Sequence, residues 1–267
     1  MTGVPSLSDI DVRLRLMDAY PGVVQVLTLA APPLETLVTP GDAVELARIA
    51  NDELAELVAK YPDRFIAAVA CLPLNDMDAA LEEADRAITE LKLVGVQLNS
   101  NINGAYLGEP QFRPLYEKVS RYDLPLWIHP WFPSPVGPRN RRLDWPYDTS
   151  LAMLSLVRAG VFEDYPTIKF ITHHCGGMIP FFAARLGEDK TRKFYNDTAI
   201  YGNTPALMCG HAHFGTDHLL FGTDMPLARV MNGFTLETIE AIEHMDIPDV
   251  DKNMIFEGNA KRLLRLS

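Results

Sequence analysis

Three short apolar runs in this sequence end in side chains that can bind a metal ion or move a proton. The runs at 126–129, 170–174 and 219–224 end in His129, in the adjacent pair His173 and His174, and in Asp224, respectively. Imidazole and carboxylate groups are common zinc ligands and common general acids and bases. If the three runs are parallel strands of one sheet, their ends lie at the same edge and these groups meet in one site.

Strand-like and helical patterns alternate along the chain, which predicts βαβ units and a parallel sheet. We expect strands at 23–30, 65–74, 94–98, 124–129, 169–174, 194–199 and 219–224, separated by helices that include 39–61, 76–91, 110–121, 148–162 and 235–244. A closed barrel has eight strands, whereas an open sheet tolerates seven, so the count leaves both architectures possible. The first strand runs into Ala31-Pro32-Pro33 and not into a glycine-rich loop, which argues against a dinucleotide site.

The composition is that of an ordinary soluble protein and excludes several partners. The 267 residues are 48% hydrophobic and carry a formal net charge of -11, so we expect neither a nucleic-acid partner nor an anionic membrane partner. The three cysteines are far apart, which favours a reducing cytoplasmic location over a disulfide framework. No stretch has the composition of an interdomain linker, so we predict a single domain over residues 1–267.

Six short motifs occur in a fixed order along the chain. They are Met17-Asp18 with Gly22–Leu27, Gly95–Gly104, His129-Pro130-Trp131, His174–Pro180, Phe221–Pro226 and Gly258–Leu263. Together they resemble the amidohydrolase-related (amidohydrolase 2) family, which includes aminocarboxymuconate-semialdehyde decarboxylase, resorcylate-type decarboxylases, and related hydratases and lactonases. The resemblance implies an α/β fold, namely a distorted TIM (β/α)8 barrel of the metal-dependent hydrolase type.

The same resemblance implies roles for three of the strand-end residues. His129 and Asp224 correspond to metal ligands, so a divalent cation, zinc in the first instance, is the implied cofactor. His174 corresponds to a catalytic base or substrate contact, because the His-x-Gly-Gly pattern selects it over His173, and Asp224 is the second catalytic candidate. A small-molecule carboxylate substrate and a homo-oligomeric assembly are implied in the same way.

One part of the family pattern is missing from this chain. The family's first strand ends in a His-x-His pair that supplies two metal ligands, but the first histidine here is His129. We therefore expect a barrel whose first strand is absent, and a truncated or misassigned start in preference to a stable seven-stranded barrel. His129 and Asp224 alone fall short of the roughly three protein ligands of a catalytic zinc site, so metal occupancy is weakened.

Three further residues follow strand ends and are candidates for substrate binding. Trp131 is placed to wall an aromatic pocket, although a packed loop tryptophan fits equally well. Asn101 follows the strand at 94–98, where turn formation is the alternative role. Arg139 belongs to a basic cluster in the loop after His129 and could pair with a carboxylate, while a solvated or intersubunit position is the alternative.

These observations lead to one preferred function and two alternatives. The preferred function is an enzyme that carries out metal-dependent, non-oxidative decarboxylation of a small aromatic or unsaturated carboxylic acid. The first alternative is metal-dependent hydrolysis of a lactone or amide on the same barrel. The second is a catalytically degenerate barrel that lacks metal.

Overall fold

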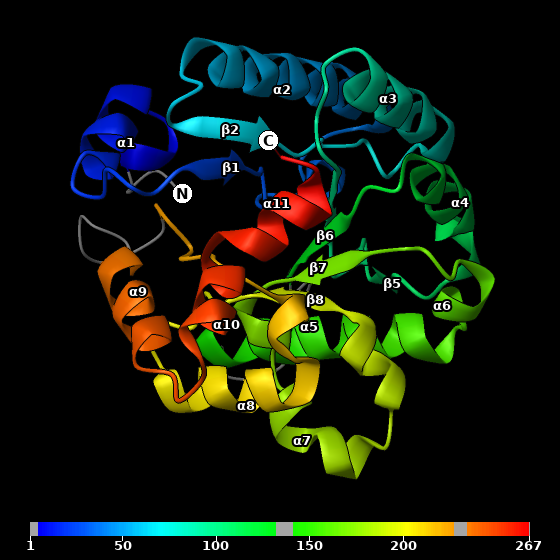
Figure 1. Ribbon diagram of the computed structural model, residues 1–267. Coiled ribbons are helices and arrows are strands. Elements are labelled where there is room, and N and C mark those ends of the chain that lie inside the picture. Colours follow the sequence, from blue (N-terminus) through cyan, green and yellow to red (C-terminus); the bar gives the residue numbers. More distant parts are fainter. Residues whose placement is uncertain (1–4, 132–140, 227–233, 267) are drawn as a thin grey trace.

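The computed structural model describes residues 5–131, 141–226 and 234–266 (Figure 1). The helices are α1 (Ile10–Met17), α2 (Pro40–Lys60), α3 (Met77–Thr89), α4 (Arg113–Tyr122), α5 (Arg141–Arg158), α6 (Val161–Asp164), α7 (Ile179–Leu186), α8 (Thr204–Phe214), α9 (Thr235–Glu243), α10 (Asp249–Asn253) and α11 (Asn259–Leu264). The strands are β1 (Gln25–Leu27), β2 (Phe65–Ala68), β3 (Val96–Asn99), β4 (Asn101–Ile102), β5 (Ala105–Tyr106), β6 (Leu126–His129), β7 (Phe170–Thr172), β8 (Tyr195–Asp197) and β9 (Leu219–Leu220).

Seven of the described strands form a curved parallel arrangement with helices on its outside, whereas β4 and β5 form a separate antiparallel pair. β1 pairs with β2, and a five-stranded sheet has the order β3-β6-β7-β8-β9. An isolated parallel bridge from Ala70 to Val96 joins these two sheets. The strands β1, β2, β3, β6, β7, β8 and β9 then follow one another in chain order. Among the described residues, β1 has no sheet partner besides β2, and β9 has none besides β8. The parallel sheet with helices that the sequence predicted is therefore confirmed.

Helix starts follow the local sequence signals. Thr39 caps α2 by accepting a hydrogen bond from the backbone N–H of Asp42, and Pro40 occupies the first helical turn. Asp76 caps α3 in the same manner through Ala79. These caps confirm the predicted starts of both helices, of which α2 packs against β2.

Strand residues alternate between an outer and an inner face. Residues on the outer face, such as Leu98, Ile128 and Phe170, are fully or almost fully buried against the helices. A separate inner cluster contains Trp127, Ile171 and Leu220 together with Leu263 and Leu264 of α11. Consistent with this packing, α11 crosses the middle of the strand arrangement in Figure 1.

The strand arrangement is open between β1 and β9. A cavity of about 1540 Å³ has walls from both of these edges, including Val24 and Val26 on one side and Leu220 and Phe221 on the other. Val24 directly precedes β1, and 43% of its surface is exposed. Among the described residues, no strand pairs with this edge of β1 to cover it. This cavity also contains most of the strand-end side chains discussed below.

Several element boundaries differ from the sequence-based expectation. The strand expected at 169–174 ends at Thr172, because His174 and Cys175 adopt positive φ values and turn the chain. The helix expected from residue 148 already begins at Arg141 and continues through Pro146. In the described part of the chain, no helix has both the length and the apolar character needed to cross a membrane.

Candidate active site

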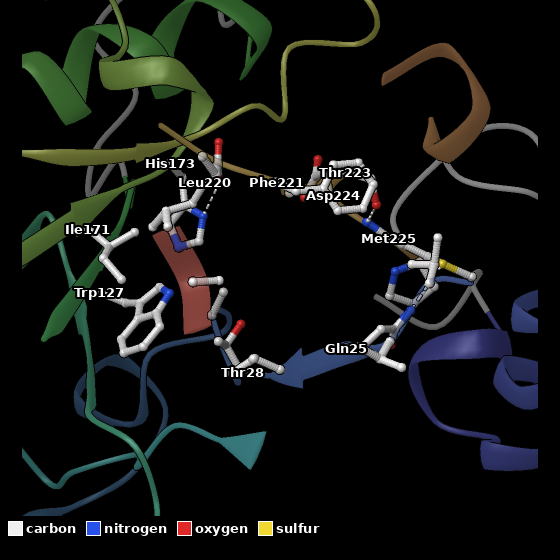
Figure 2. A pocket seen from close by; sticks show the side chains of 18 of the residues that line it. Gln25, Thr28, Trp127, Ile171, His173, Leu220, Phe221, Thr223, Asp224 and Met225 are labelled. Atoms are coloured by element: carbon white, nitrogen blue, oxygen red, sulfur yellow. Dashed lines mark hydrogen bonds and ion pairs between the residues drawn. The ribbon is translucent and has the colours of Figure 1, made fainter. Parts of the chain in front are cut away.

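The register of the parallel strands brings four polar residues into one row. Asn99 of β3 and His129 of β6 are direct partners. The pairing of β6 with β7, and of β7 with β8, continues this row to His173 and Asp197. His129, His173 and Asp197 border the large cavity, and Figure 2 shows the His173 ring directed into it.

His129 lies in the middle of this row and is buried, with 7% of its surface exposed. Its ring centre is 5.2 Å from that of His173, and its Nδ1 has no hydrogen-bond partner among the described residues. Burial, followed by the neighbouring histidines His173 and His174, holds the pKa of His129 well below its usual range. The imidazole is therefore neutral near pH 7, and its unprotonated nitrogen can accept a hydrogen bond.

His173 and Asp197 form a hydrogen-bonded pair on adjacent strands. Nδ1 of His173 lies 2.7 Å from Oδ2 of Asp197. Oδ1 of the same carboxylate accepts the backbone N–H groups of His174 at 2.7 Å and Ala199 at 3.0 Å. When the neutral ring donates its Nδ1–H to the carboxylate, Nε2 carries the lone pair, and this atom has no partner among the described residues.

The pKa of Asp197 reflects two opposing effects. Burial raises it, but the hydrogen bond from His173 and the positive charge that this ring can carry outweigh burial, so the pKa of Asp197 lies below its usual value. The carboxylate therefore stays ionised beside the imidazole. A buried carboxylate in this position fixes both the tautomer and the orientation of the ring.

Asp224 follows β9 at the same cavity. It has a φ of 62° and precedes a cis peptide bond between Met225 and Pro226. Burial and the negative charge of Asp197 raise the pKa of Asp224 to about 7, although His173 and Tyr201 oppose the shift. The structure thus brings Asp224 together with His129 and His173, as the convergence of strand ends predicted.

His174 lies behind this wall and does not border the cavity. Its ring stacks on Trp145, with an interplanar angle of 4° and a centroid distance of 6.2 Å. Burial lowers the pKa of His174 to about 4. The catalytic role assigned to His174 stays a prediction, whereas the geometry gives the cavity position to His173, the neighbour that the motif did not select.

The three substrate-binding candidates fall in different environments. Trp131 borders the cavity, together with Trp127 and Trp145. The Asn101 amide is engaged within the protein: Nδ2 donates to the carbonyl oxygen of Trp131 at 2.5 Å, and Oδ1 accepts the N–H of Gly104 at 3.0 Å. Its contacts are those of the turn-forming alternative. Arg139 lies outside the described residues.

A buried carboxylate that sequence reasoning missed holds the end of β6 in place. Asp148 of α5 is 0% exposed and accepts hydrogen bonds from the Ser100 hydroxyl, from the Tyr106 hydroxyl at 2.9 Å, and from the Trp131 N–H at 3.3 Å. The Ser100 hydroxyl oxygen also accepts the Trp131 N–H at 2.7 Å, and the Ser100 N–H donates to the carbonyl oxygen of His129 at 2.8 Å. Asp148 and Ser100 together therefore fix the segment that carries His129 and Trp131.

The donor set falls short of a complete metal centre. In the described parts of the chain, no group of three or more histidine, cysteine, aspartate or glutamate side chains could hold a metal ion. His129 and Asp224 are available as metal ligands, but Nδ1 of His173 and Oδ2 of Asp197 are hydrogen-bonded to each other. Because a catalytic zinc site uses about three protein ligands, the described residues do not fit the expected zinc centre on their own.

Comparisons with known proteins agree with this architecture. The chain is 30% identical over 295 residues to gamma-resorcylate decarboxylase from a Rhizobium species, covering 96% of this chain and 87% of the relative. It is 28% identical over 285 residues to 2-amino-3-carboxymuconate-6-semialdehyde decarboxylase from Dictyostelium discoideum, covering 97% of this chain and 77% of the relative.

Solved structures of similar proteins share the fold. A 2,6-dihydroxybenzoate decarboxylase in complex with 2,6-dihydroxybenzoate superposes with a TM-score of 0.86 at 30% identity, over 96% of this chain and 87% of that one. A dihydroxybenzoic acid decarboxylase from Polaromonas, with bound manganese and the inhibitor 2-nitroresorcinol, gives 0.84 at 29% identity, over 96% and 85%. The fold is therefore that of the TIM-barrel decarboxylases, with a divalent metal present in such relatives. Since the sequence model of the amidohydrolase family also matches residues 3–266, the chain belongs to the amidohydrolase family.

Proposed function

We propose that this protein is a non-oxidative decarboxylase of a small aromatic hydroxy acid. The observation that carries the proposal is the row of His129, His173 and Asp197, with Asp224 beside it, on the wall of a cavity that also contains tryptophans. The similar decarboxylases of resorcylate and dihydroxybenzoate support this substrate class. Aromatic walls with a few convergent polar groups are typical of a site for a flat, partly polar ligand.

The reaction needs one proton and no oxidant. The bond between the ring carbon and the carboxylate breaks, CO₂ leaves, and the electron pair that stays on the ring carbon takes up a proton. His173 and Asp224 border the cavity and can carry protons, so we assign proton delivery to this pair. The Asp197 carboxylate holds the His173 ring in place during the transfer, and Trp131 contacts the aromatic ring of the substrate.

The cofactor is the second part of the proposal. When bound, a divalent metal would polarise the oxygen atoms of the substrate, and His129 and Asp224 are the side chains that the resemblance assigns to it. Manganese is present in a solved relative, and zinc is the ion first expected for this chain. No step above depends on the metal, because the described donors form an incomplete set.

The incomplete donor set also favours a second candidate function. A barrel that binds aromatic acids without turning them over would keep the cavity and the tryptophan wall, but would lack the metal. We further propose a homo-oligomer in the cytoplasm. The three free cysteines support that location, while the oligomer rests on the resemblance alone.

Product analysis separates these functions. Purified protein is incubated with 2,6-dihydroxybenzoate in D₂O, with and without added Mn²⁺ or Zn²⁺, and CO₂ and resorcinol are quantified. Decarboxylation yields resorcinol with one deuterium at the carbon that lost the carboxylate. His173→Ala and Asp224→Asn should abolish this product. Binding of the acid without CO₂ release under any metal condition would instead establish the binding function, and acid production from a lactone panel would establish a hydrolase.

A further inference from the structure

The cavity wall contains an arginine that pairs with no carboxylate of the described residues. Arg13 of α1 borders the same cavity as His129, His173 and Asp224. Its Nε and Nη2 donate to a single acceptor, Oε1 of Gln25, at 2.9 and 2.7 Å. Its guanidinium also lies over the Phe65 ring, 5.7 Å from the centroid. In the described part of the chain these are its recorded polar and aromatic partners, and none of them is an anion.

An unneutralised cation in this position is energetically unfavourable. Burial alone lowers the pKa of Arg13 to about 10, with no carboxylate to offset it. Other partly buried arginines of the chain have acidic partners: Arg86 pairs with Glu83 at 2.8 Å, and Arg64 with Asp18 at 2.5 Å. A desolvated charge without a counter-charge is costly, and Arg13 lacks the acidic partner that Arg86 and Arg64 have among the described residues.

Gln25 connects Arg13 to the segment that carries Asp224. The Nε2 atom of Gln25 lies 3.1 Å from Sδ of Met225, the residue after Asp224. Figure 2 shows Gln25, Met225 and Asp224 on one side of the cavity and Trp127, Ile171 and His173 on the other. A ligand held by the Arg13 side therefore faces the inner apolar wall and the imidazole of His173.

We propose that Arg13 is the anion-recognition group of this cavity and binds the carboxylate of a small organic ligand. The guanidinium has five N–H donors, and two of them are used by Gln25. The remaining donors can form the paired hydrogen bonds that arginine makes with a carboxylate. Gln25 orients the guanidinium group by accepting from Nε and Nη2, and the remaining N–H groups stay free to bind the ligand.

This inference rests on the proposed function for the identity of the ligand, but not for its test, which measures binding. Dissociation constants of 2,6-dihydroxybenzoate and of resorcinol, the same ring without the carboxylate, are measured by tryptophan fluorescence. In Arg13→Gln, binding of the acid should weaken about tenfold or more, while resorcinol binding changes less than twofold. Arg15→Gln is the matched control, since Arg15 is on the same helix and exposed.

A second variant keeps the test decisive if loss of Arg13 impairs folding. Gln25→Glu places a carboxylate where Gln25 Oε1 now accepts both hydrogen bonds, and so neutralises Arg13 from within. We expect this variant to melt at a higher temperature than the wild type and yet to bind the acid about tenfold more weakly. Equal affinity of the wild type, Arg13→Gln and Gln25→Glu for the acid would overturn the proposal, whether or not the protein decarboxylates it.

The kinetics of an active enzyme add a further criterion. Because the carboxylate loses its charge as CO₂ forms, an arginine bound to it holds the ground state at least as tightly as the transition state, so loss of the arginine raises KM and does not lower kcat. Arg13→Gln should therefore lower kcat/KM through KM. A fall in kcat with an unchanged KM would contradict a role in ligand recognition.

Discussion

Nδ1 of His173 lies 2.7 Å from Oδ2 of Asp197, and the two residues are neighbours across β7 and β8 at the cavity wall. The other carboxylate oxygen is held by two backbone N–H groups. The imidazole is therefore hydrogen-bonded to a carboxylate that cannot rotate freely. The Nε2 atom of His173 has no partner in the described part of the chain. This is the arrangement of a group that presents one nitrogen to a ligand.

Replacement of Asp197 by Asn tests this relationship. An amide can still accept the backbone N–H groups, but it no longer holds the imidazole by a charge-assisted hydrogen bond. Loss of such an orienting partner typically costs about 10- to 100-fold, so we expect kcat to fall by about this factor with a small change in KM. The imidazole signals of His173 in NMR spectra should shift in the same variant. Unchanged kcat and unchanged imidazole signals would show that Asp197 does not orient the ring.

Much of this site follows from the sequence because strand ends converge. His129 and Asp224 are separated by almost a hundred residues in the chain, yet the parallel arrangement predicts that they meet, and they border one cavity. The choice between His173 and His174 did not follow from the sequence. Adjacent residues point to opposite faces of a strand, and only the register of β7 with β6 and β8 shows which of the two faces inward.

Two other site residues were missed for different reasons. Asp197 lies inside the strand predicted at 194–199, which was expected to continue to Ala199, so the strand-end criterion did not select it; in the structure β8 ends at Asp197. Arg13 gave no comparable signal, because a helical arginine in a polar segment is usually solvated. Its position on the cavity wall depends on the packing of α1 against the first two strands, and on the open edge beside β1. Such tertiary relationships have no local sequence pattern.

The hydrogen bonds around Asp148 predict unequal effects of two conservative substitutions. Ser100→Ala removes the hydroxyl that bonds both Asp148 and the Trp131 N–H. Tyr106→Phe removes the hydrogen bond to the other oxygen of the Asp148 carboxylate. The hydrogen bonds of the Trp131 segment to Ser100 and Asp148 stay in place. We expect Ser100→Ala to lose about 1–2 kcal/mol of unfolding free energy and to weaken ligand binding severalfold. Tyr106→Phe should show a similar loss of stability but near-normal affinity. Equal affinities in the two variants would show that Ser100 serves stability alone.

Glu35 provides a prediction for the pH dependence of stability. It is 9% exposed, burial raises its pKa, and hydrogen bonds from its own backbone N–H and from that of Leu74, at 3.3 Å, only partly compensate. The folded state therefore binds the Glu35 proton more tightly than the unfolded state, and stability is lost as pH rises through the folded pKa. Glu35→Gln should be more stable than wild type at pH 7–8, as measured by urea denaturation, and the difference should disappear below about pH 4. Glu53→Gln, at an exposed position, is the control and should show no difference at either pH.

The metal content follows from the donor set around His129. No three-ligand group occurs among the described residues, so we expect these 267 residues to retain a divalent metal weakly and below one ion per chain after dialysis. Elemental analysis of the purified protein measures this directly, and titration with Zn²⁺ or Mn²⁺ gives the affinity. His129→Ala and Asp224→Asn should each reduce the amount of metal bound per chain, while His211→Ala, on α8, should leave it unchanged. Tight stoichiometric metal that survives chelation would require ligands in addition to His129 and Asp224. In that case the His173 and Asp197 variants decide whether the pair opens to provide one of them.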